Sequence, residues 1–180
     1  MEREKSCCFT GHRPQNLPWG KHEEDLGCRK TREALALAIE YAYQDGYRFF
    51  YCGMARGIDL MAAELVLHSK QFHPDIMLIA AVPCPGQTKG WSMAEIQRYC
   101  DILEQCRSEH IQILSPSHTA QCMMERNRYM VDNSQRVIAV YNGNASGGTA
   151  YTISYALHQC LEIVMIDPND PRLPERHTFL

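Results

Sequence analysis

The sequence predicts a doubly wound α/β fold, in which helices cover both faces of a mostly parallel sheet of about six strands. Apolar runs and helical patterns alternate along almost the whole chain of 180 residues, as in a succession of β–α units. The run at 76–82 is apolar throughout and needs cover on both faces, which is typical of a parallel strand. Glycine-containing turns follow several of these runs, and in such a sheet they gather at one edge.

Apolar runs predict the strands, which we expect at 6–10, 48–52, 76–82, 110–114, 136–141 and 162–166. Helical spacing of apolar residues predicts the helices, which we expect at 31–45, 58–69, 92–109, 121–133 and 149–160. Gly46 ends the first helix and Pro83 ends the third strand. Prolines and charges from Asp167 onward predict a surface tail. We therefore expect one Rossmann-like domain over residues 1–167 and a C-terminal tail over 168–180.

The composition is that of one compact soluble domain. Of the residues, 45% are hydrophobic, and no linker rich in glycine, serine or proline divides the chain. The formal charge of −3 and the pI of about 6.2 give no global basic field for nucleic acid, although a local arginine cluster could still bind phosphate. A nucleic-acid partner is therefore not favoured.

Cysteine, histidine and apolar patterns bound the environment of the chain. The nine cysteines include no CxxC pair and lie mostly in or beside apolar runs, so we expect reduced core thiols. The eight histidines lack HxxxH or HExxH spacing, and no metal site is expected. No apolar run approaches the ~20 residues that cross a bilayer, and no signal-peptide core follows the N-terminal MEREK. We expect a cytoplasmic protein without a membrane partner, and the sequence leaves a homo-oligomer open.

The segment GMARGID, at 53–59, lies between an apolar aromatic run and a helical pattern. A strand, a glycine turn and a helix start form an arrangement in which backbone N–H groups and the helix dipole can hold a phosphate. Gly53 and Gly57 permit positive φ and close approach, and Arg56 offers charge. Asp59 lies in the first helical turn, where it either caps the helix or contacts a ribose hydroxyl.

A second glycine turn, SGGT at 146–149, follows the strand at 136–141 and opens another helix. Its glycines clear space, while Ser146 or Thr149 could offer a hydroxyl or cap the helix. Two such turns on one sheet suggest a ligand of nucleotide size. The segment TGHRP, at 10–14, also leaves a strand, and there Arg13 could bind a phosphate with its two-pronged guanidinium.

The segment ERNRYM, at 125–130, carries two arginines two residues apart on an expected helix. They point about 200° apart around the axis, so Arg126 and Arg128 should have different partners, one a phosphate and the other an ion pair, unless the segment is simply a solvated face. Trp91, on the loop after the third strand, either stacks on a base or closes a core edge. The chain has neither a GxSxG nucleophile turn nor a Walker GxxxxGK[ST] loop.

Together these segments resemble the SLOG superfamily, the Rossmann-like group that unites the DNA-processing protein A domain with the Lonely Guy phosphoribohydrolases. The chain looks closest to the small bacterial YpsA-like branch, and the resemblance covers nearly all of it. GMARGIDLMAAEL is similar to the GxARGIDxxAH segment of the DNA-processing family, and residues 126–128 match that family's RNR. The resemblance implies a Rossmann-like fold and a nucleotide-type ligand on the rim described above.

The chain departs from the Lonely Guy pattern at the residue that serves glycosidic cleavage. Those enzymes carry PGGxGTxxE, and aligning GT with Gly148 and Thr149 puts Thr152 in place of the glutamate. A carboxylate stabilises the oxocarbenium-like transition state of such a cleavage, and threonine supplies no such charge. Phosphoribohydrolase activity is therefore not expected. The carboxylates that could replace the missing one are Glu64, Glu125 and Asp132.

We therefore expect a protein that binds a nucleotide-derived small molecule, such as an ADP-ribose or NAD relative, as a sensor or a sequestering protein. A nucleotide-cleaving hydrolase and a single-stranded nucleic-acid-binding protein are the alternatives. The sequence does not assign the catalytic residues of a hydrolase, for which Arg126 and Glu125 are the candidates. The expected ligand-binding residues are Thr10, Gly11, His12, Arg13, Gly53, Met54, Ala55, Arg56, Gly57, Asp59, Gln87, Trp91, Arg126, Arg128, Asn142, Ser146, Gly147, Gly148 and Thr149.

Overall fold

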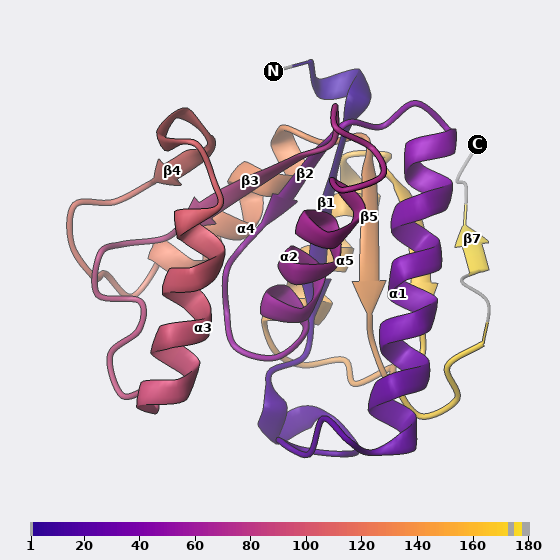
Figure 1. The fold of residues 1–180 in the computed structure, drawn as a ribbon, viewed down its shortest axis with the longest axis horizontal. Helices are drawn as coiled ribbons and strands as arrows, with labels where there is room; N and C mark the ends of the chain where they lie inside the picture. The colour runs from indigo at the N-terminus through magenta and orange to yellow at the C-terminus, as the bar shows by residue number, and fades with distance from the viewer. Residues whose placement is uncertain (1, 173–174, 178–180) are drawn as a thin grey trace.

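A computed structural model describes residues 2–172 and 175–177 of the chain. It contains one seven-stranded sheet with the strand order β4-β3-β2-β1-β5-β6-β7 (Figure 1). The strands are β1 (Ser6–Gly11), β2 (Phe49–Cys52), β3 (Met77–Val82), β4 (Ile111–Ile113), β5 (Arg136–Val140), β6 (Glu162–Ile166) and β7 (Glu175–His177). The first six pair in parallel, which confirms the predicted fold class.

Helices cover both faces of this sheet. They are α1 (Leu26–Gln44), α2 (Ile58–Ser69), α3 (Met93–Glu104), α4 (Cys122–Asp132) and α5 (Gly148–His158). In Figure 1, α1, α2 and α3 lie in front of the sheet, and α4 and α5 lie behind it. Alternate strand residues serve the two layers: Ile138 and Val140 pack with the front helices, whereas Val137 and Ala139 pack with α4 and α5. The sheet is therefore buried on both sides, as a parallel sheet requires.

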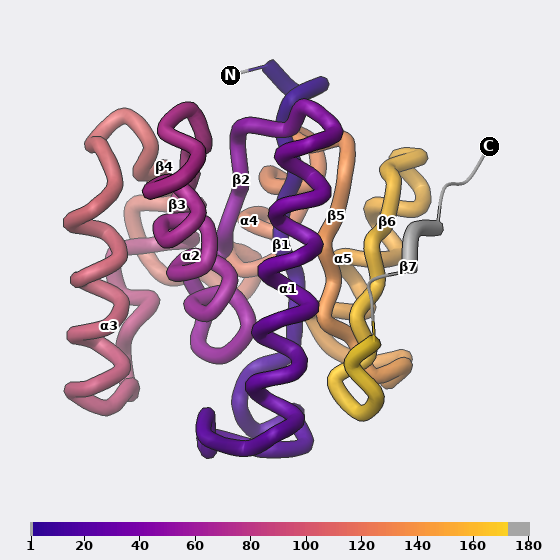
Figure 2. The backbone as a smooth tube through the Cα atoms, turned by 45° about the vertical axis from the view of Figure 1, so that its right-hand side comes forward, coloured from indigo at the N-terminus to yellow at the C-terminus, as the bar shows by residue number. Residues whose placement is uncertain are grey.

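The order of the strands creates a crevice beside β1. From β1 the chain adds β2, β3 and β4 toward one edge, then returns to place β5 on the other side of β1 (Figure 2). The connections that leave β1 and β5 therefore diverge, and ligands of doubly wound sheets bind beyond the carboxyl ends of strands at such a point. The segments TGHRP and SGGT follow these two strands.

Two helices differ by five residues at one end from the limits expected, whereas α4 and α5 differ by one or two residues at their ends. Helix α1 begins at Leu26 rather than at Thr31, because the Asp25 carboxylate caps it by accepting a hydrogen bond of 2.7 Å from the Gly27 amide. The sequence analysis missed this start, because Gly27 has a low helix propensity and interrupts the helical pattern in the first turn. Helix α3 ends at Glu104 rather than near residue 109, and a short 3-10 turn, η3 (Ser108–His110), leads into β4.

The segment after Asp167, expected as a surface tail, contributes a strand. Strand β7 pairs antiparallel with β6, with Val164 opposite Arg176. This correction raises the sheet from about six strands to seven. The physical reason is that β6 would otherwise present its backbone groups at an open edge. The prolines and charges of the segment gave no indication of this pairing.

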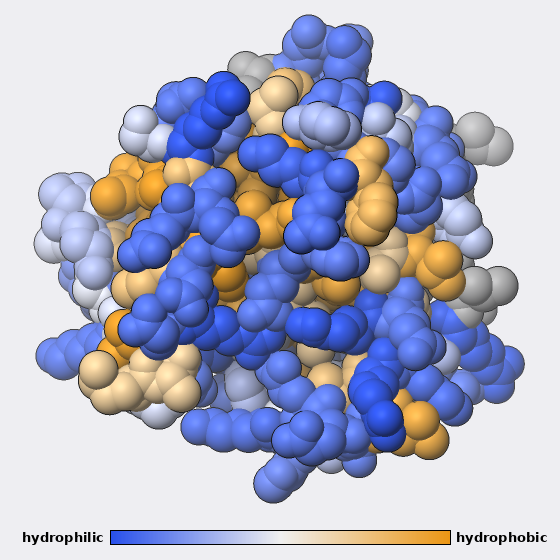
Figure 3. Space-filling model, viewed as in Figure 1, coloured by the Kyte–Doolittle hydropathy of each residue, from blue (hydrophilic) through white to orange (hydrophobic). Residues whose placement is uncertain are grey.

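All nine cysteines are free thiols, and six of them are buried. Burial raises the pKa of Cys8 to about 12, so this thiol is an apolar core side chain at neutral pH. The face of the molecule over the front helices is largely hydrophilic, with apolar side chains showing between the polar ones (Figure 3). Among the residues that the structure describes, no helix has the length and apolar character needed to cross a membrane.

Candidate functional site

The crevice at the carboxyl ends of the strands holds two adjoining cavities. The first, here called the glycine-side cavity, has a volume of about 370 Å³ and lies between β1, α2, α4 and the start of α5. It is lined by Phe9, Thr10, Gly11, His12, Arg13, Gln15, Asn16, Ala55, Asp59, Met123, Arg126, Asn127, Met130, Ser146, Gly147, Gly148 and Thr149. Residues from both halves of the sheet thus meet in one place.

The second, here called the tryptophan-side cavity, has a volume of about 440 Å³. It is lined by Arg13, Ala55, Arg56, Gly86, Gln87, Lys89, Trp91, His118 and Met123. Arg13, Ala55 and Met123 line both cavities, so one elongated molecule could occupy the two together. Three cationic side chains line this cavity, which favours an anionic ligand.

The N-terminus of α5 opens into the glycine-side cavity. Gly147 precedes the helix with a φ of 97°, and no side chain among the residues that the structure describes caps this end. An added Cβ would meet nothing within 4 Å at Gly147 and only the Asn127 Nδ2 at 3.8 Å from Gly148. The first-turn amides of a helix have no partner within the helix and lie at the positive end of its dipole. This terminus is therefore suited to an anion.

The side chains expected to cap α5 have other roles. The Ser146 hydroxyl donates to the Asn144 Oδ1 at 3.0 Å, so Ser146 does not cap the helix. Thr149 is buried and lines the glycine-side cavity. Thr152, one turn further, is completely buried, and its hydroxyl donates to the Gly148 carbonyl at 2.8 Å.

Arg126 lies in the wall of the glycine-side cavity and is only 5% exposed. Its Nη1 donates to the Gly53 carbonyl and lies 3.6 Å from the Asp59 Oδ2. Its Nε is one of four buried side-chain atoms without a hydrogen-bond partner among the described residues. Burial lowers the pKa of Arg126, and the Asp59 carboxylate opposes that shift. Arg126 is thus a buried cation with one donor still to be satisfied.

Asp59 supports Arg126 and the turn before α2. Its Oδ2 accepts a hydrogen bond of 3.2 Å from the Ala55 amide. Burial raises the pKa of this carboxyl group, while the Arg126 guanidinium acts in the opposite direction. No side chain caps α2, whose N-cap residue is Gly57, so the helix-capping alternative for Asp59 is wrong. Asp59 lines the glycine-side cavity beside Arg126.

The GMARGID turn is packed against the protein rather than open as expected. The Ile58 amide donates to the His12 carbonyl at 3.3 Å, and a Cβ on Gly57 would lie 2.6 Å from the same oxygen. Gly57 has the expected positive φ, at 88°. Gly53 does not have a positive φ, and the left-handed residue next to it is Met54, with a φ of 56°. A Cβ on Gly53 would overlap the Arg126 guanidinium. The glycines of this turn therefore position Arg126 and β1, and the open helix N-terminus is that of α5.

Trp91 and Arg56 form one wall of the tryptophan-side cavity. The Arg56 guanidinium carbon lies 5.6 Å from the centroid of the Trp91 ring, and its Nη1 lies 3.6 Å from the Glu95 Oε1. Trp91 also meets the ring of Tyr99 edge-on at 5.7 Å between centroids. Trp91 therefore both packs on the core and faces the cavity, so neither of its two predicted roles excludes the other.

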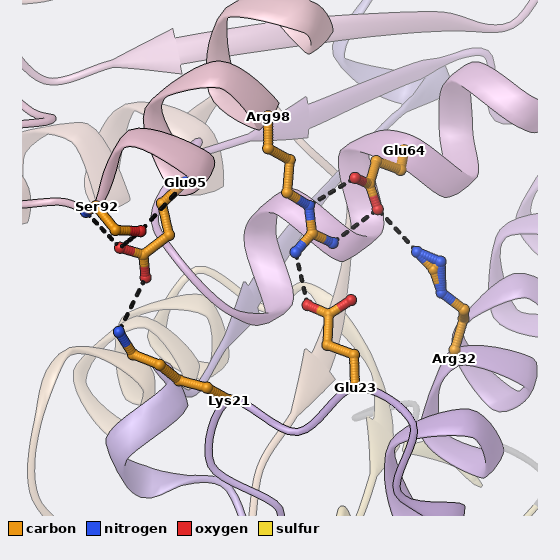
Figure 4. Close-up of polar contacts among 7 residues, drawn as sticks. All are labelled: Lys21, Glu23, Arg32, Glu64, Ser92, Glu95 and Arg98. Atoms are coloured by element: carbon orange, nitrogen blue, oxygen red, sulfur yellow. Dashed lines mark hydrogen bonds and ion pairs between the residues drawn. The ribbon is translucent and has the colours of Figure 1, made fainter.

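Ion pairs anchor the loop that follows Arg13 to the front helices (Figure 4). Arg98 of α3 donates to Glu23 in this loop at 2.6 Å and to Glu64 of α2 at 2.6 and 2.7 Å. Arg32 of α1 donates to the same Glu64 at 2.7 Å. Lys21 lies 3.6 Å from Glu95, which forms a capping box with Ser92 at the start of α3. The loop that follows Arg13 is thus paired with α3, which Glu64 in turn joins to α2 and α1.

Five expected ligand-binding residues line neither cavity. Gly53, Met54 and Gly57 shape the turn before α2, and the Asn142 Oδ1 accepts a hydrogen bond of 2.8 Å from the Nε2 of the buried His12. Arg128 is exposed, donates to the Tyr151 hydroxyl and stacks on Tyr155. Glu125, the other expected catalytic residue, is exposed and also lies outside both cavities.

Sequence reasoning missed several lining residues. These are Phe9, Gln15, Asn16, Gly86, Lys89, His118, Met123, Asn127 and Met130. Asn127 lies inside the RNR segment, and Met123 lies one helical turn before Arg126, so helical spacing could have found both. His118 lies on the loop before α4, where no residue pattern pointed to the crevice. Within residues 2–172 and 175–177, no three His, Cys, Asp or Glu side chains could hold a metal ion together.

The fold and the crevice define a Rossmann-like domain with a candidate ligand site at its topological switch point. The chain belongs to the YspA SLOG family, whose family model matches residues 7–170. It is 26% identical over 170 residues to the UPF0398 protein BH1768 of Halalkalibacterium halodurans, covering 92% of this chain and 89% of that protein. It is 24% identical over 154 residues to a UPF0398 protein of Bacillus thuringiensis strain Al Hakam, covering 84% and 82%.

Two solved structures share the fold. The X-ray structure of DNA processing protein A (DprA) from Streptococcus pneumoniae matches with a TM-score of 0.59 and 15% identity over 91% of this chain. This chain spans half the length of that protein, since the match covers 50% of it. The X-ray structure of TM1055 matches with a TM-score of 0.53 and 11% identity, covering 88% of this chain and 72% of TM1055. At these identities the likeness shows the fold alone.

Proposed function

We propose that the crevice binds a nucleotide-derived small molecule, such as an ADP-ribose or NAD relative, and that the protein senses or sequesters it. The observation that carries this proposal is Arg126, a buried cation in the cavity wall whose Nε has no hydrogen-bond partner within the described part of the chain. It lines the same cavity as the uncapped N-terminus of α5. A buried donor beside a positive helix end is an arrangement that a phosphate group satisfies.

The rest of the crevice supports a ligand larger than a free anion. The two cavities adjoin at Arg13, and the second offers Arg56, Lys89 and the Trp91 ring. Cationic side chains attract phosphates, and aromatic rings stack on planar bases. Membership of the SLOG family agrees with a nucleotide-related role.

Binding is favoured over cleavage because of where the carboxylates lie. Glu64 pairs with Arg32 and Arg98, Glu125 is exposed, and Asp132 accepts a hydrogen bond of 2.9 Å from the Tyr155 hydroxyl. None of these three lines either cavity.

A nucleotide-cleaving enzyme is the second candidate function, and Asp59 is the observation that favours it. Asp59 lines the glycine-side cavity, and burial raises its pKa, as is common for catalytic acids. Its negative charge, however, faces the Arg126 guanidinium, which weakens the support it could give to an oxocarbenium-like state.

Single-stranded nucleic acid is the third candidate, favoured by the shared fold with DprA. The cationic residues Arg13, Arg56 and Lys89 would form the groove for its backbone. Such binding would weaken steeply with salt, because each neutralised phosphate releases counterions. A small nucleotide held in a cavity should show a much weaker dependence.

Calorimetric titration tests the proposal with ADP-ribose, NAD and AMP, with adenosine as the unphosphorylated reference and a thymidine oligonucleotide for the third candidate. In Arg126→Lys the charge beside Asp59 is kept and the Nε donor is lost. We expect binding of the phosphorylated ligands to weaken by about 1.5 to 3 kcal/mol, the scale of a charge-assisted hydrogen bond, and that of adenosine to change little.

Arg128→Lys is the matched control, since Arg128 lies on the same helix but outside the cavities. It should bind like the unmodified protein, and circular dichroism melts of both variants report whether they fold. If none of the nucleotides binds, or if adenosine loses as much affinity as AMP, Arg126 does not bind a phosphate and the proposal falls.

A further inference from the structure

Gln87 is a second buried side chain of the crevice that lacks one partner. It lies on the loop after β3, is 6% exposed and lines the tryptophan-side cavity. Its Nε2 donates to the carbonyl of Gly53 at 3.1 Å and to that of Met54 at 2.7 Å. Its Oε1 has no hydrogen-bond partner among the described residues.

The two carbonyls fix which way this amide points. A carbonyl oxygen only accepts hydrogen bonds, so turning the amide over would set the Gln87 Oε1 against two other oxygens. The free end of Gln87 is therefore an acceptor, and its orientation follows from its partners rather than from an arbitrary choice of O and N. A buried acceptor without a donor is costly, and a ligand that brings an N–H or O–H group would satisfy it.

Arg126 and Gln87 are held by the same atom. The Arg126 Nη1 and the Gln87 Nε2 both donate to the Gly53 carbonyl, so one backbone oxygen orients a side chain in each cavity. The atoms left over have opposite character, since the Arg126 Nε is a donor and the Gln87 Oε1 is an acceptor. A ligand that satisfies both atoms therefore carries a hydrogen-bond acceptor for the Arg126 Nε and a hydrogen-bond donor for the Gln87 Oε1.

The surroundings of Gln87 narrow the kind of donor. The half-buried Trp91 ring lines the same cavity and offers an aromatic surface on which a planar ring can stack. A nucleobase with an amino group combines such a planar ring with an N–H donor. The cationic Arg56 and Lys89 favour a neutral ring attached to phosphate over a cationic group.

We propose that the tryptophan-side cavity is a base subsite, in which the Gln87 Oε1 accepts a hydrogen bond from the amino group of a nucleobase. The phosphate of the same nucleotide then lies at Arg126 and the N-terminus of α5. This inference rests on the proposed nucleotide site and adds the part of the ligand that the site selects.

The test compares nucleotides that differ by one amino group. The pairs are AMP with purine riboside 5′-monophosphate, GMP with inosine 5′-monophosphate, and CMP with 2-pyrimidinone riboside 5′-monophosphate, each titrated by calorimetry. We expect the amino form of at least one pair to bind about tenfold or more tightly, because its absence leaves a buried acceptor unpaired.

Two variants assign this preference to Gln87. Gln87→Lys keeps donors for the Gly53 and Met54 carbonyls and removes the acceptor, and Gln87→Met removes both. In each the preference for the amino form should fall to within about twofold, while dependence on the phosphate remains. Gln97→Lys is the control, because Gln97 on α3 bonds to Asp101 and lines neither cavity.

The outcomes separate this inference from the proposed function. If nucleotides bind and depend on Arg126, but each pair binds equally, the base subsite is wrong and the phosphate site stands. A preference that persists unchanged in Gln87→Lys also overturns the inference, since another group then recognises the amine. If no nucleotide binds the unmodified protein, both proposals fail.

Discussion

Glycines shape this site in two physically different ways. At Gly53 there is no room, because a Cβ would overlap the guanidinium of Arg126. At Gly148 there is room, because the nearest atom to an added Cβ is the Asn127 Nδ2 at 3.8 Å. The first glycine lets two protein groups pack together, and the second keeps a cavity wall open. The sequence shows a glycine in both turns but does not distinguish these two roles, because the roles depend on contacts with α4.

Substitutions at these two positions should therefore have opposite consequences. Gly148→Val adds a side chain in open space at a cavity wall, so stability should change by less than about 1 kcal/mol while nucleotide binding is lost. Gly53→Ala should lower the free energy of unfolding by about 1 to 3 kcal/mol by overpacking and should displace Arg126. Urea denaturation and calorimetric titration measure the two effects. Unchanged nucleotide affinity in folded Gly148→Val would show that the N-terminus of α5 does not hold the ligand.

The arginine pair shows how far residue spacing can be trusted. Helical geometry predicts that Arg126 and Arg128 have different partners, and the structure confirms it, since Arg126 is buried in the cavity wall and Arg128 lies on two half-buried tyrosines. Spacing alone does not reveal that Asp59 lies beside Arg126 or that Gln87 shares its carbonyl. Those contacts join elements far apart in the sequence, so only the assembled sheet brings them together.

At the scale of the elements, the three front helices are joined through one carboxylate. Glu64 on α2 accepts hydrogen bonds from Arg32 on α1 and from Arg98 on α3 (Figure 4). Burial by itself raises the pKa of Glu64, but the hydrogen bonds from Arg98 and Arg32 outweigh it and hold that pKa below its ordinary value of 4.5. The folded state therefore favours the charged form of Glu64.

Glu64→Gln should lower the free energy of unfolding by about 1 to 2 kcal/mol at neutral pH, since the network is partly exposed to solvent. Because the folded pKa is lowered, the contribution of Glu64 is complete above pH 4.5 and is lost as the pH falls through the folded pKa. The gap between variant and unmodified protein should thus narrow as the pH falls below 4.5. Urea melts at neutral pH and at a series of pH values below 4.5 measure it, with the exposed Glu33→Gln on α1 as control. A gap independent of pH would mean that Glu64 contributes packing rather than charge.

Element boundaries could be predicted where local chemistry decides them. Helix α2 has the limits expected from the sequence, 58–69, and strand β6 those expected, 162–166. Strand β7 could not be predicted from the sequence, because it forms by pairing with the open edge of β6 and its own residues give no strand pattern. The start of α1 was missed although its cause is local. Asp25 caps the helix, but Gly27 in the first turn made a helix start there look unfavourable.

At the scale of the whole molecule, the crevice exists because the order in which strands are added to the sheet reverses beside β1. The first half of the chain supplies Arg13, Arg56 and Gln87, and the second half supplies Arg126 and the N-terminus of α5. The alternation of strands and helices predicts this rim from sequence, since parallel strands end at one edge. It does not predict that one of the two glycine turns is closed by packing against β1.

The balance of charges across the whole crevice argues for binding without turnover. Among the residues lining the two cavities, Asp59 supplies the carboxylate, and its Oδ2 lies 3.6 Å from the Arg126 Nη1. We expect the unmodified protein to release no free base from AMP, NAD or ADP-ribose above a blank, because no unpaired negative charge is placed to stabilise an oxocarbenium-like state. Chromatographic detection of the free base measures this for all three ligands, and ribose 5-phosphate is the second product expected from AMP. Thr152→Glu should destabilise the fold rather than create activity, since it would place a carboxylate at a completely buried position. Turnover by the unmodified protein that disappears in Asp59→Asn would instead establish the hydrolase, with Asp59 as its acid.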